Sequence, residues 1–202
     1  MNQTVLVPIA NGSEEIEAVT VIDTLIRANY QVVVASANFD SSCQITGSRG
    51  IALQADCPLV NVADEEFDAI VLPGGVGGAE CFRDSTLLIE MLKQHRYDGK
   101  WLAAICAAPA VVLQSHQLYP KAIMTAHPDF EAAIPRSQWR SKRVTVDINH
   151  KLITSQGPGS ALEFSVEIIA KLSGKAHAKQ VVQPMVPLPQ LNYDKLGGQP
   201  ET

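Results

Sequence analysis

The chain has 202 residues, 46% of them hydrophobic, so it is long enough to bury a core of its own. Its formal net charge is −5 and its basic residues are scattered along the chain. This excludes the clustered basic patches that bind nucleic acids or anionic membranes. The longest apolar run, residues 101–113, is too short for a bilayer, and no signal peptide opens the chain. We expect a cytoplasmic protein with no membrane or nucleic-acid partner.

Short β-branched and aliphatic runs alternate with amphipathic stretches along the chain. Four runs are typical of buried parallel strands, namely Thr4–Ala10, Gln31–Ala37, Asp68–Leu72 and Lys100–Ile105. Helical periodicity follows at residues 15–29, 85–97 and 160–172. Two later runs, at residues 143–148 and 151–154, are close enough to form an antiparallel hairpin. This order predicts an α/β fold with a doubly wound, mostly parallel sheet.

The composition changes at Ala178, after which Gln, Pro and Gly dominate. Prolines at positions 184, 187, 189 and 200 favour an extended segment over another helix or strand. We therefore predict a single domain over residues 1–177, followed by a C-terminal tail over residues 178–202.

Cys106 is the candidate nucleophile among four cysteines. It follows the apolar run 101–105 and precedes Ala107-Ala108-Pro109, where proline suits the first turn of a helix. Such a strand-to-helix turn is mechanically similar to the nucleophile elbow of hydrolases, and amides at a helix start favour a thiolate. The alternative is a small side chain that only fills the core, the interpretation we adopt for Cys43, Cys57 and Cys81. The four form no CxxC pair and have no histidine at zinc-ligand spacing, so we expect no metal.

Further candidates follow other predicted strands, where open parallel sheets bind their ligands. Glu14 and Glu15 are interpreted as first-turn charges that interact with the helix dipole. Glu17 stands among apolar neighbours, which favours a less solvated position. His127 is either a surface histidine or a group that exchanges protons near neutral pH. The remaining histidines are expected to face solvent: His95, His116, His150 and His177.

Four glycines between residues 74 and 78 could suggest a phosphate-binding loop. The dinucleotide pattern that starts at Gly75 requires glycine or alanine at position 80, where glutamate stands. No Gly-Lys-Ser/Thr follows any glycine run. We therefore expect no nucleotide cofactor, and no other cofactor.

Taken together, four separated motifs resemble the ThiJ/PfpI superfamily and, within it, the DJ-one/YajL subgroup with its bacterial YajL-like proteins. These motifs are NGSEEIE at residues 11–17, VLPGG at 71–75, AAICAAP at 103–109 and TSQGPG at 154–159. The resemblance covers nearly the whole chain. It implies a flavodoxin-like sandwich with helices on both faces of the sheet, and a homodimer.

The resemblance also implies roles for individual residues. Cys106 would be the nucleophile, Glu17 the protonated acid beside it and His127 the third residue of the site. A thiolate about 4 Å away, at an effective dielectric near 20, disfavours ionisation of Glu17 by roughly 4 kcal/mol, which outweighs the roughly 0.3–1 kcal/mol that the helix dipole offers its carboxylate. Backbone N–H groups would stabilise an oxyanion, namely those of Gly74, Gly75 and Ala107.

Two arginines, Arg27 and Arg49, match basic positions that lie near the dimer interface in the resembled family. Ala107 departs from the members with protease-like or chaperone-like activity, which carry histidine directly after the cysteine. The missing base makes an amidase or protease the lesser alternative.

The activities that the resemblance implies are cofactor-independent. They are a glyoxalase III-type conversion of methylglyoxal to lactate, deglycase repair of glycated protein side chains or nucleotides, and protection against oxidative stress. The alternative from another class is a redox-sensing holdase chaperone in which Cys106 is oxidised to a sulfinate that Glu17 hydrogen-bonds. The expected partners are small reactive carbonyl compounds.

Overall fold

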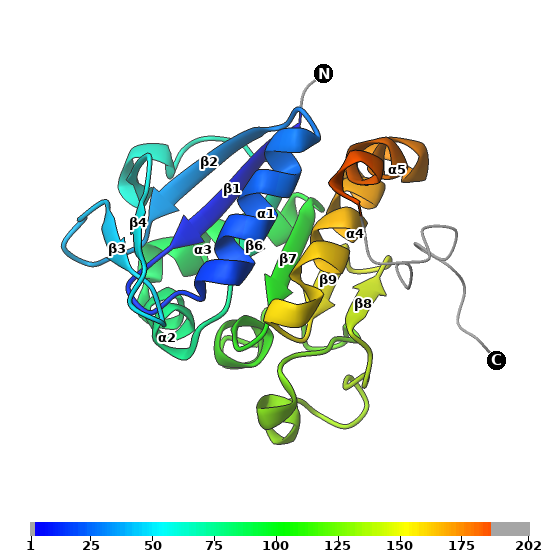
Figure 1. Cartoon of the computed structure of the whole chain (residues 1–202). Coiled ribbons are helices and arrows are strands. Elements are labelled where there is room, and N and C mark those ends of the chain that lie inside the picture. Colours follow the sequence, from blue (N-terminus) through cyan, green and yellow to red (C-terminus); the bar gives the residue numbers. More distant parts are fainter. Residues whose placement is uncertain (1–2, 187–202) are drawn as a thin grey trace.

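The computed structural model describes residues 3–186 and has a seven-stranded sheet at its centre, in the order β5-β2-β1-β6-β7-β9-β8 (Figure 1). Neighbouring strands pair in parallel except β8 with β9, which form the expected antiparallel hairpin at one edge. The strands are β1 (Thr4–Ile9), β2 (Gln31–Ser36), β5 (Cys57–Pro58), β6 (Ala69–Leu72), β7 (Trp101–Ile105), β8 (Val144–Asp147) and β9 (Leu152–Ser155). The predicted mostly parallel sheet is confirmed.

Helices cover both faces of this sheet (Figure 1). One face carries α1 (Glu15–Arg27), α4 (Ala161–Ser173) and α5 (Lys175–Val182), and the other carries α2 (Val76–Asp84), α3 (Thr86–Tyr97) and a π-type helix, Pro109–Gln114. Because side chains alternate along a strand, β1 sends Val5 and Val7 into the core under α1 and Leu6 into the core under α3. The flavodoxin-like arrangement is confirmed.

The predicted tail begins too early. Residues 175–182 form α5, in which Ala178, Val181 and Val182 are buried against the α1 and α4 side of the sheet. A short 3-10 helix, Gln183–Met185, follows. The apolar residues of α5 form one packing face. This helix was not predicted from the sequence, because the prolines farther along the chain favoured an extended segment. The rest of the predicted tail, residues 187–202, lies outside the described residues.

Several short elements have no clear signal in the sequence. A second sheet pairs β3 (Gln44–Thr46) with β4 (Ala52–Gln54), and 3-10 helices form at Leu59–Val62, Pro128–Ala133 and Pro158–Ser160. One histidine is also not where we expected it. His95 is buried, and its Nε2 hydrogen-bonds the backbone carbonyl of Trp101 at 2.8 Å. This burial lowers the pKa of His95.

The strand order reverses between β1 and β6, since β1 pairs with β2 on one side and with β6 on the other. The arrows of β1, β2 and β7 point toward the same lower part of the molecule in Figure 1, where the loops after these strands meet. Open α/β sheets bind ligands at such a reversal. Among the described helices, none is both long and apolar enough to cross a bilayer.

Candidate active site

Cys106 follows the last residue of β7 in a sharp turn. Its φ is 64°, in the left-handed region that a residue with a side chain rarely occupies. Two backbone hydrogen bonds hold it there, because Cys106 N–H donates to Ser155 O at 2.9 Å and Cys106 O accepts from His127 N–H at 2.9 Å. The predicted strand, turn and helix are therefore present, with Pro109 opening the helical segment.

Glu17 lies in the first turn of α1 and is fully buried. Its Oε2 accepts a hydrogen bond of 2.7 Å from the Gly74 N–H, and its Oε1 is buried without a hydrogen-bond partner among the described residues. Burial, together with the charge of Glu14, raises the pKa of Glu17 to about 7, against the lowering effect of the Gly74 and Cys106 hydrogen bonds. The carboxyl of Glu17 is thus poorly solvated, and its role in the site stays a prediction.

The turn alone does not activate Cys106, so this part of the prediction is wrong. Burial and the charge of Glu17 raise the pKa of the Cys106 thiol to about 12, although N–H groups of Gly75 and Ala107 donate to the sulfur and act in the opposite direction. Because a charge on either side chain raises the pKa of the other, the two titrate as a pair. Glu17 loses its proton first, near pH 7, and a thiolate forms when the Glu17 carboxylate takes up the remaining proton from the sulfur.

The backbone donors divide between two tasks. Gly75 and Ala107 donate to the Cys106 sulfur, which places both next to the atom that a substrate would meet. Gly74 was predicted to be an oxyanion donor, but its single N–H is already given to Glu17 Oε2. The prediction for Gly74 is therefore wrong, and Gly74 instead orients the carboxyl of Glu17.

Glycine is required at positions 74 and 75 for steric reasons. A Cβ at Gly74 would overlap Cys106 Cβ and lie 2.6 Å from Glu17 Oε2. Gly75 has φ of 80°, and a Cβ there would lie 2.6 Å from the backbone nitrogen of Glu14. The Pro-Gly-Gly segment thus lets the loop after β6 pass directly between α1 and the nucleophile.

A cavity of about 500 Å³ opens above Cys106. Its wall combines the loop after β1, the β3–β4 turn, the start of α2 and the segment that begins at His127; the lining residues include Glu14, Ser48, Arg49, Val76, Cys106, His127, Asp129 and Phe130. The wall is apolar at Val76, Phe130 and Pro158 and carries polar or charged side chains at Glu14, Ser48, Arg49, His127 and Asp129. It suits a small polar molecule, or one group of a larger molecule, presented to the sulfur.

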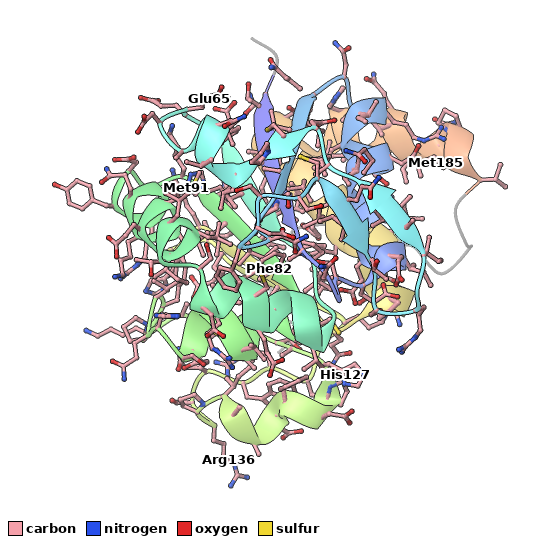
Figure 2. The ribbon with its side chains drawn as sticks, turned by 90° about the vertical axis from the view of Figure 1, so that its left-hand side faces the viewer. Glu65, Phe82, Met91, His127, Arg136 and Met185 are labelled. Atoms are coloured by element: carbon pink, nitrogen blue, oxygen red, sulfur yellow. The ribbon has the colours of Figure 1, made fainter. Side chains whose placement is uncertain are left out.

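His127 stands at the start of the short helix Pro128–Ala133, as Figure 2 shows. Its side chain lines the cavity with Cys106 and is 39% exposed. Its Nδ1 accepts from Asp129 N–H at 3.3 Å and lies 3.4 Å from Asp129 Oδ2. The structure therefore brings His127 to the cavity that Cys106 lines, while Glu17 lies buried behind the wall and hydrogen-bonds Cys106.

The two predicted arginines lie in different places. Arg49 lines the cavity, and its backbone N–H donates to Glu15 Oε1 at 2.7 Å. Arg27 is exposed in the last turn of α1 and forms an ion pair of 2.6 Å with Asp23. Ten residues of helix separate it from Glu17, about 15 Å along the axis, so within one chain Arg27 is outside the site.

Sequence reasoning missed several residues of the cavity wall, among them the two carboxylates, Glu14 and Asp129. Glu14 is only 7% exposed, and its Oε2 accepts from Glu17 N–H at 2.8 Å as the N-cap of α1. Its position three residues before Glu17, at a helix start, is the signal that could have found it. Asp129 has no comparable signal in the sequence, because the loop conformation decides whether its side chain lies beside His127 and faces the cavity.

Named proteins resemble this chain in sequence. Protein DJ-1 homolog B of Arabidopsis thaliana is 44% identical over 177 residues, 88% of this chain and 40% of the plant protein, so the chain spans about two fifths of that relative. Protein dj-1beta of Drosophila melanogaster is 35% identical over 183 residues, 91% of this chain and 96% of the fly protein. The glutathione-independent glyoxalase DJR-1.2 of Caenorhabditis elegans is 29% identical over 173 residues, 86% of this chain and 90% of that protein.

Solved structures resemble the fold equally well. The crystal structure of VC2308 protein superposes with a TM-score of 0.93 at 45% identity, covering 98% of this chain and 100% of the other. Oxidized DJ-1 of Toxoplasma gondii superposes with a TM-score of 0.87 at 44% identity, covering 91% and 98%. The model of the DJ-1/PfpI family matches residues 3–171, and the chain belongs to this family.

Proposed function

We propose that this protein converts small reactive dicarbonyl compounds to hydroxy acids without a cofactor, with methylglyoxal to lactate as the reference reaction. One observation carries the proposal. A half-buried thiol at a strained turn lines a cavity, and two backbone N–H donors and a carboxyl with its pKa near 7 contact this thiol. The name of the nematode relative, a glutathione-independent glyoxalase, supports the same chemistry.

The reaction begins with the Cys106 thiolate. The sulfur adds to the aldehyde carbon of methylglyoxal and forms a hemithioacetal, whose oxygen is near the N–H groups of Gly75 and Ala107. His127 is placed to donate a hydrogen bond to a substrate oxygen in the same cavity. These groups act on charge that develops during the addition.

Glu17 then moves one proton. It first gives the proton that it holds beside the thiolate to the hemithioacetal oxygen and so becomes a carboxylate. The carboxylate removes the hydrogen from the former aldehyde carbon, which leaves an enediolate, and returns a proton to the neighbouring carbon. The hydroxyl proton on the former aldehyde carbon passes to the enediolate oxygen, so a thioester carbonyl and a new hydroxyl group form. The product is a thioester of lactate on Cys106, and water cleaves it to lactate and the free thiol. The net reaction is methylglyoxal plus water to lactate, with no net oxidation, so no redox cofactor is consumed.

The cavity admits groups larger than methylglyoxal, so the same first step serves a glycated side chain or nucleotide. In a glycated adduct the former aldehyde carbon bears the amine. The sulfur displaces this amine, which leaves with a proton, and the same hemithioacetal results. Deglycation therefore belongs to the proposal as a second substrate class of the same pair.

We likewise propose that the chain is one of the YajL-like members of the family, although the matching relatives that bear the DJ-1 name come from plants and animals.

Lactate formation by purified protein tests the proposal. Wild type is compared with Glu17→Gln, Cys106→Ala and, as a matched control, Cys81→Ala, whose thiol lies outside the cavity and donates to Ala37 O. We expect Glu17→Gln to lose about 10²–10⁴-fold in rate, Cys106→Ala to be inactive and Cys81→Ala to keep the wild-type rate. Wild-type rates in Glu17→Gln or Cys106→Ala would refute the reaction.

A redox sensor or holdase chaperone is the second candidate, favoured by the oxidized state named for the Toxoplasma structure. Here peroxide converts Cys106 to a sulfinate, and the protonated Glu17 donates a hydrogen bond to it. Peroxide titration with mass spectrometry separates the two candidates. The sensor predicts that Glu17→Gln changes how far Cys106 oxidises and that wild type makes no lactate.

A further inference from the structure

Glu15 makes contacts beyond the helix dipole that a first-turn charge meets. It is the first residue of α1 and is only 4% exposed. Three donors from the turn between β3 and β4 converge on its carboxylate. Ser48 Oγ–H donates to Oε2 at 3.0 Å, and the N–H groups of Arg49 and Ile51 donate to Oε1 at 2.7 and 3.3 Å. The carboxylate of Glu15 is therefore the shared acceptor of this turn.

The turn is shaped to receive this carboxylate. A Cβ at Gly47 would overlap the carboxylate of Glu15, so glycine leaves the space that it occupies. On the β3 side the backbone also holds the turn, because Ser48 N–H donates to Ser13 O at 2.8 Å. The Glu15 carboxylate holds the N–H groups of residues 49 and 51, which are nearer to β4.

The same turn forms part of the wall of the cavity above Cys106. Ser48 and Arg49 are among the described residues that line this cavity, and Glu15 contacts both of them from α1. Without the carboxylate, water would have to satisfy the three donors, and this favours an open turn. The position of Ser48 and Arg49 relative to the Cys106 sulfur therefore depends on Glu15.

We infer that Glu15 is a positioning residue for substrate binding, whose side-chain oxygens hold the β3–β4 turn in the wall of the Cys106 cavity. Glu15 touches no reacting atom in this role; it acts through Ser48 and Arg49. The inference deepens the proposed function and rests on it for turnover, but the width of the cavity can be measured without any dicarbonyl substrate.

The experiment compares the rates at which two reagents of different size alkylate Cys106 at pH 8, iodoacetamide and an iodoacetamide that carries fluorescein. Glu15→Ala removes the shared acceptor, whereas Glu15→Gln keeps an oxygen that can accept from the two N–H groups. Gly47→Ala places a methyl group in the same contact from the side of the turn. Glu80→Ala, which removes an exposed carboxylate from α2, is the matched control.

Thermal melting establishes that each variant is folded at the assay temperature, and Gly47→Ala replaces Glu15→Ala in the comparison if Glu15→Ala is not. The KM and kcat of lactate formation from methylglyoxal are measured on the same proteins. They separate an effect on substrate binding from an effect on the nucleophile.

In Glu15→Ala and Gly47→Ala we expect the ratio of the large-reagent rate to the small-reagent rate to rise about threefold or more, because the loss of a hydrogen bond opens the turn that often. The iodoacetamide rate and kcat should stay within about twofold of wild type, while KM rises about threefold or more. Glu15→Gln should show less than half of these changes, because all three donors are neutral and an amide oxygen still accepts from them. Glu80→Ala should show none.

An unchanged reagent ratio in the folded variant would overturn the inference and leave Glu15 as a first-turn charge only. An unchanged KM in that variant would also overturn it, and so would a change in Glu15→Gln equal to that in Glu15→Ala, because charge rather than hydrogen bonding would then hold the turn. If wild type makes no lactate, the proposed function fails while the reagent ratio still decides the role of Glu15.

Discussion

Above about pH 7 Glu17 is a carboxylate hydrogen-bonded to the Cys106 thiol and can take up its proton, which makes this thiol different from the other three. Burial raises the pKa of Cys57 and of Cys81, and neither has a carboxyl that can keep the proton for it. The nucleophile is thus created by a relation between two side chains rather than by the turn alone.

Once Glu17 has lost its proton, near pH 7, its carboxylate can accept the thiol proton as the sulfur is alkylated, so alkylation of Cys106 should increase with pH around 7. Mass-spectrometric mapping of iodoacetamide adducts in the folded protein measures it site by site. Cys43 and Cys81 are internal controls, and equal labelling of either one below pH 7 would contradict the special state of Cys106.

Glu17 should also make stability depend on pH. Its pKa rises from 4.5 to about 7 on folding, so its contribution is fully present below pH 4.5 and is lost as pH rises through 7. Glu17→Gln removes the buried charge and should unfold at higher urea than wild type at pH 8, by up to about 3 kcal/mol in free energy of unfolding, with little gain at pH 4.5. Urea titrations at both values test this, and an equal difference at both would contradict it.

At the scale of elements, the loop after β6 fits between α1 and the turn after β7 only because it lacks side chains. Gly74→Ala places a methyl group against Cys106 Cβ and Glu17 Oε2. We expect a loss of about 1–3 kcal/mol in stability, or a displaced Glu17 with slower Cys106 alkylation.

Gly159→Ala is the matched control for this loop, since no atom lies within 4 Å of a Cβ built there. It should change the melting temperature and the alkylation rate little. A Gly74→Ala variant that behaves like Gly159→Ala in both measurements would show that the close approach is not required.

The strands and long helices could be predicted because burial imposes a period on the residues of β1, β7 and α1. The helix α2 could not be predicted, because Gly77 and Gly78 lower the local helix propensity. These glycines are required because they pack closely against Gly12 and Ser13 of a loop that is distant in the sequence. Cys106 and Glu17 were found through motifs. The acceptor of the Gly74 N–H could not be predicted, because it depends on tertiary contacts that the spacing of residues in the sequence does not reveal.

At the scale of the whole molecule, α1 carries an exposed apolar row that one chain leaves uncovered. Ile16, Val19 and Ile26 share one face of the helix and are 58%, 48% and 57% exposed, and Ile51 at the nearby β3–β4 turn is 56% exposed. Isologous dimers bury such faces against themselves. We propose that this face forms the interface of a homodimer.

Light scattering at micromolar concentration should give about twice the chain mass of 21.8 kDa. Val19→Glu introduces like charges on both sides of a two-fold interface and should shift the mass toward one chain, whereas the same change at exposed Tyr97 in α3 should not. A wild-type monomer across this range would remove the interface.

The central claim is that Cys106 and Glu17 together convert a dicarbonyl by moving a proton, and the fate of one hydrogen tests it most directly. Wild-type protein is incubated with methylglyoxal in deuterium oxide, and the lactate is followed by proton NMR. Glu17 holds the removed hydrogen while the enediolate is bound and exchanges it with solvent during that time. The account therefore predicts lactate with deuterium at the carbon that bears the hydroxyl group. No lactate, or lactate that carries only the original aldehyde hydrogen at that carbon, would contradict it.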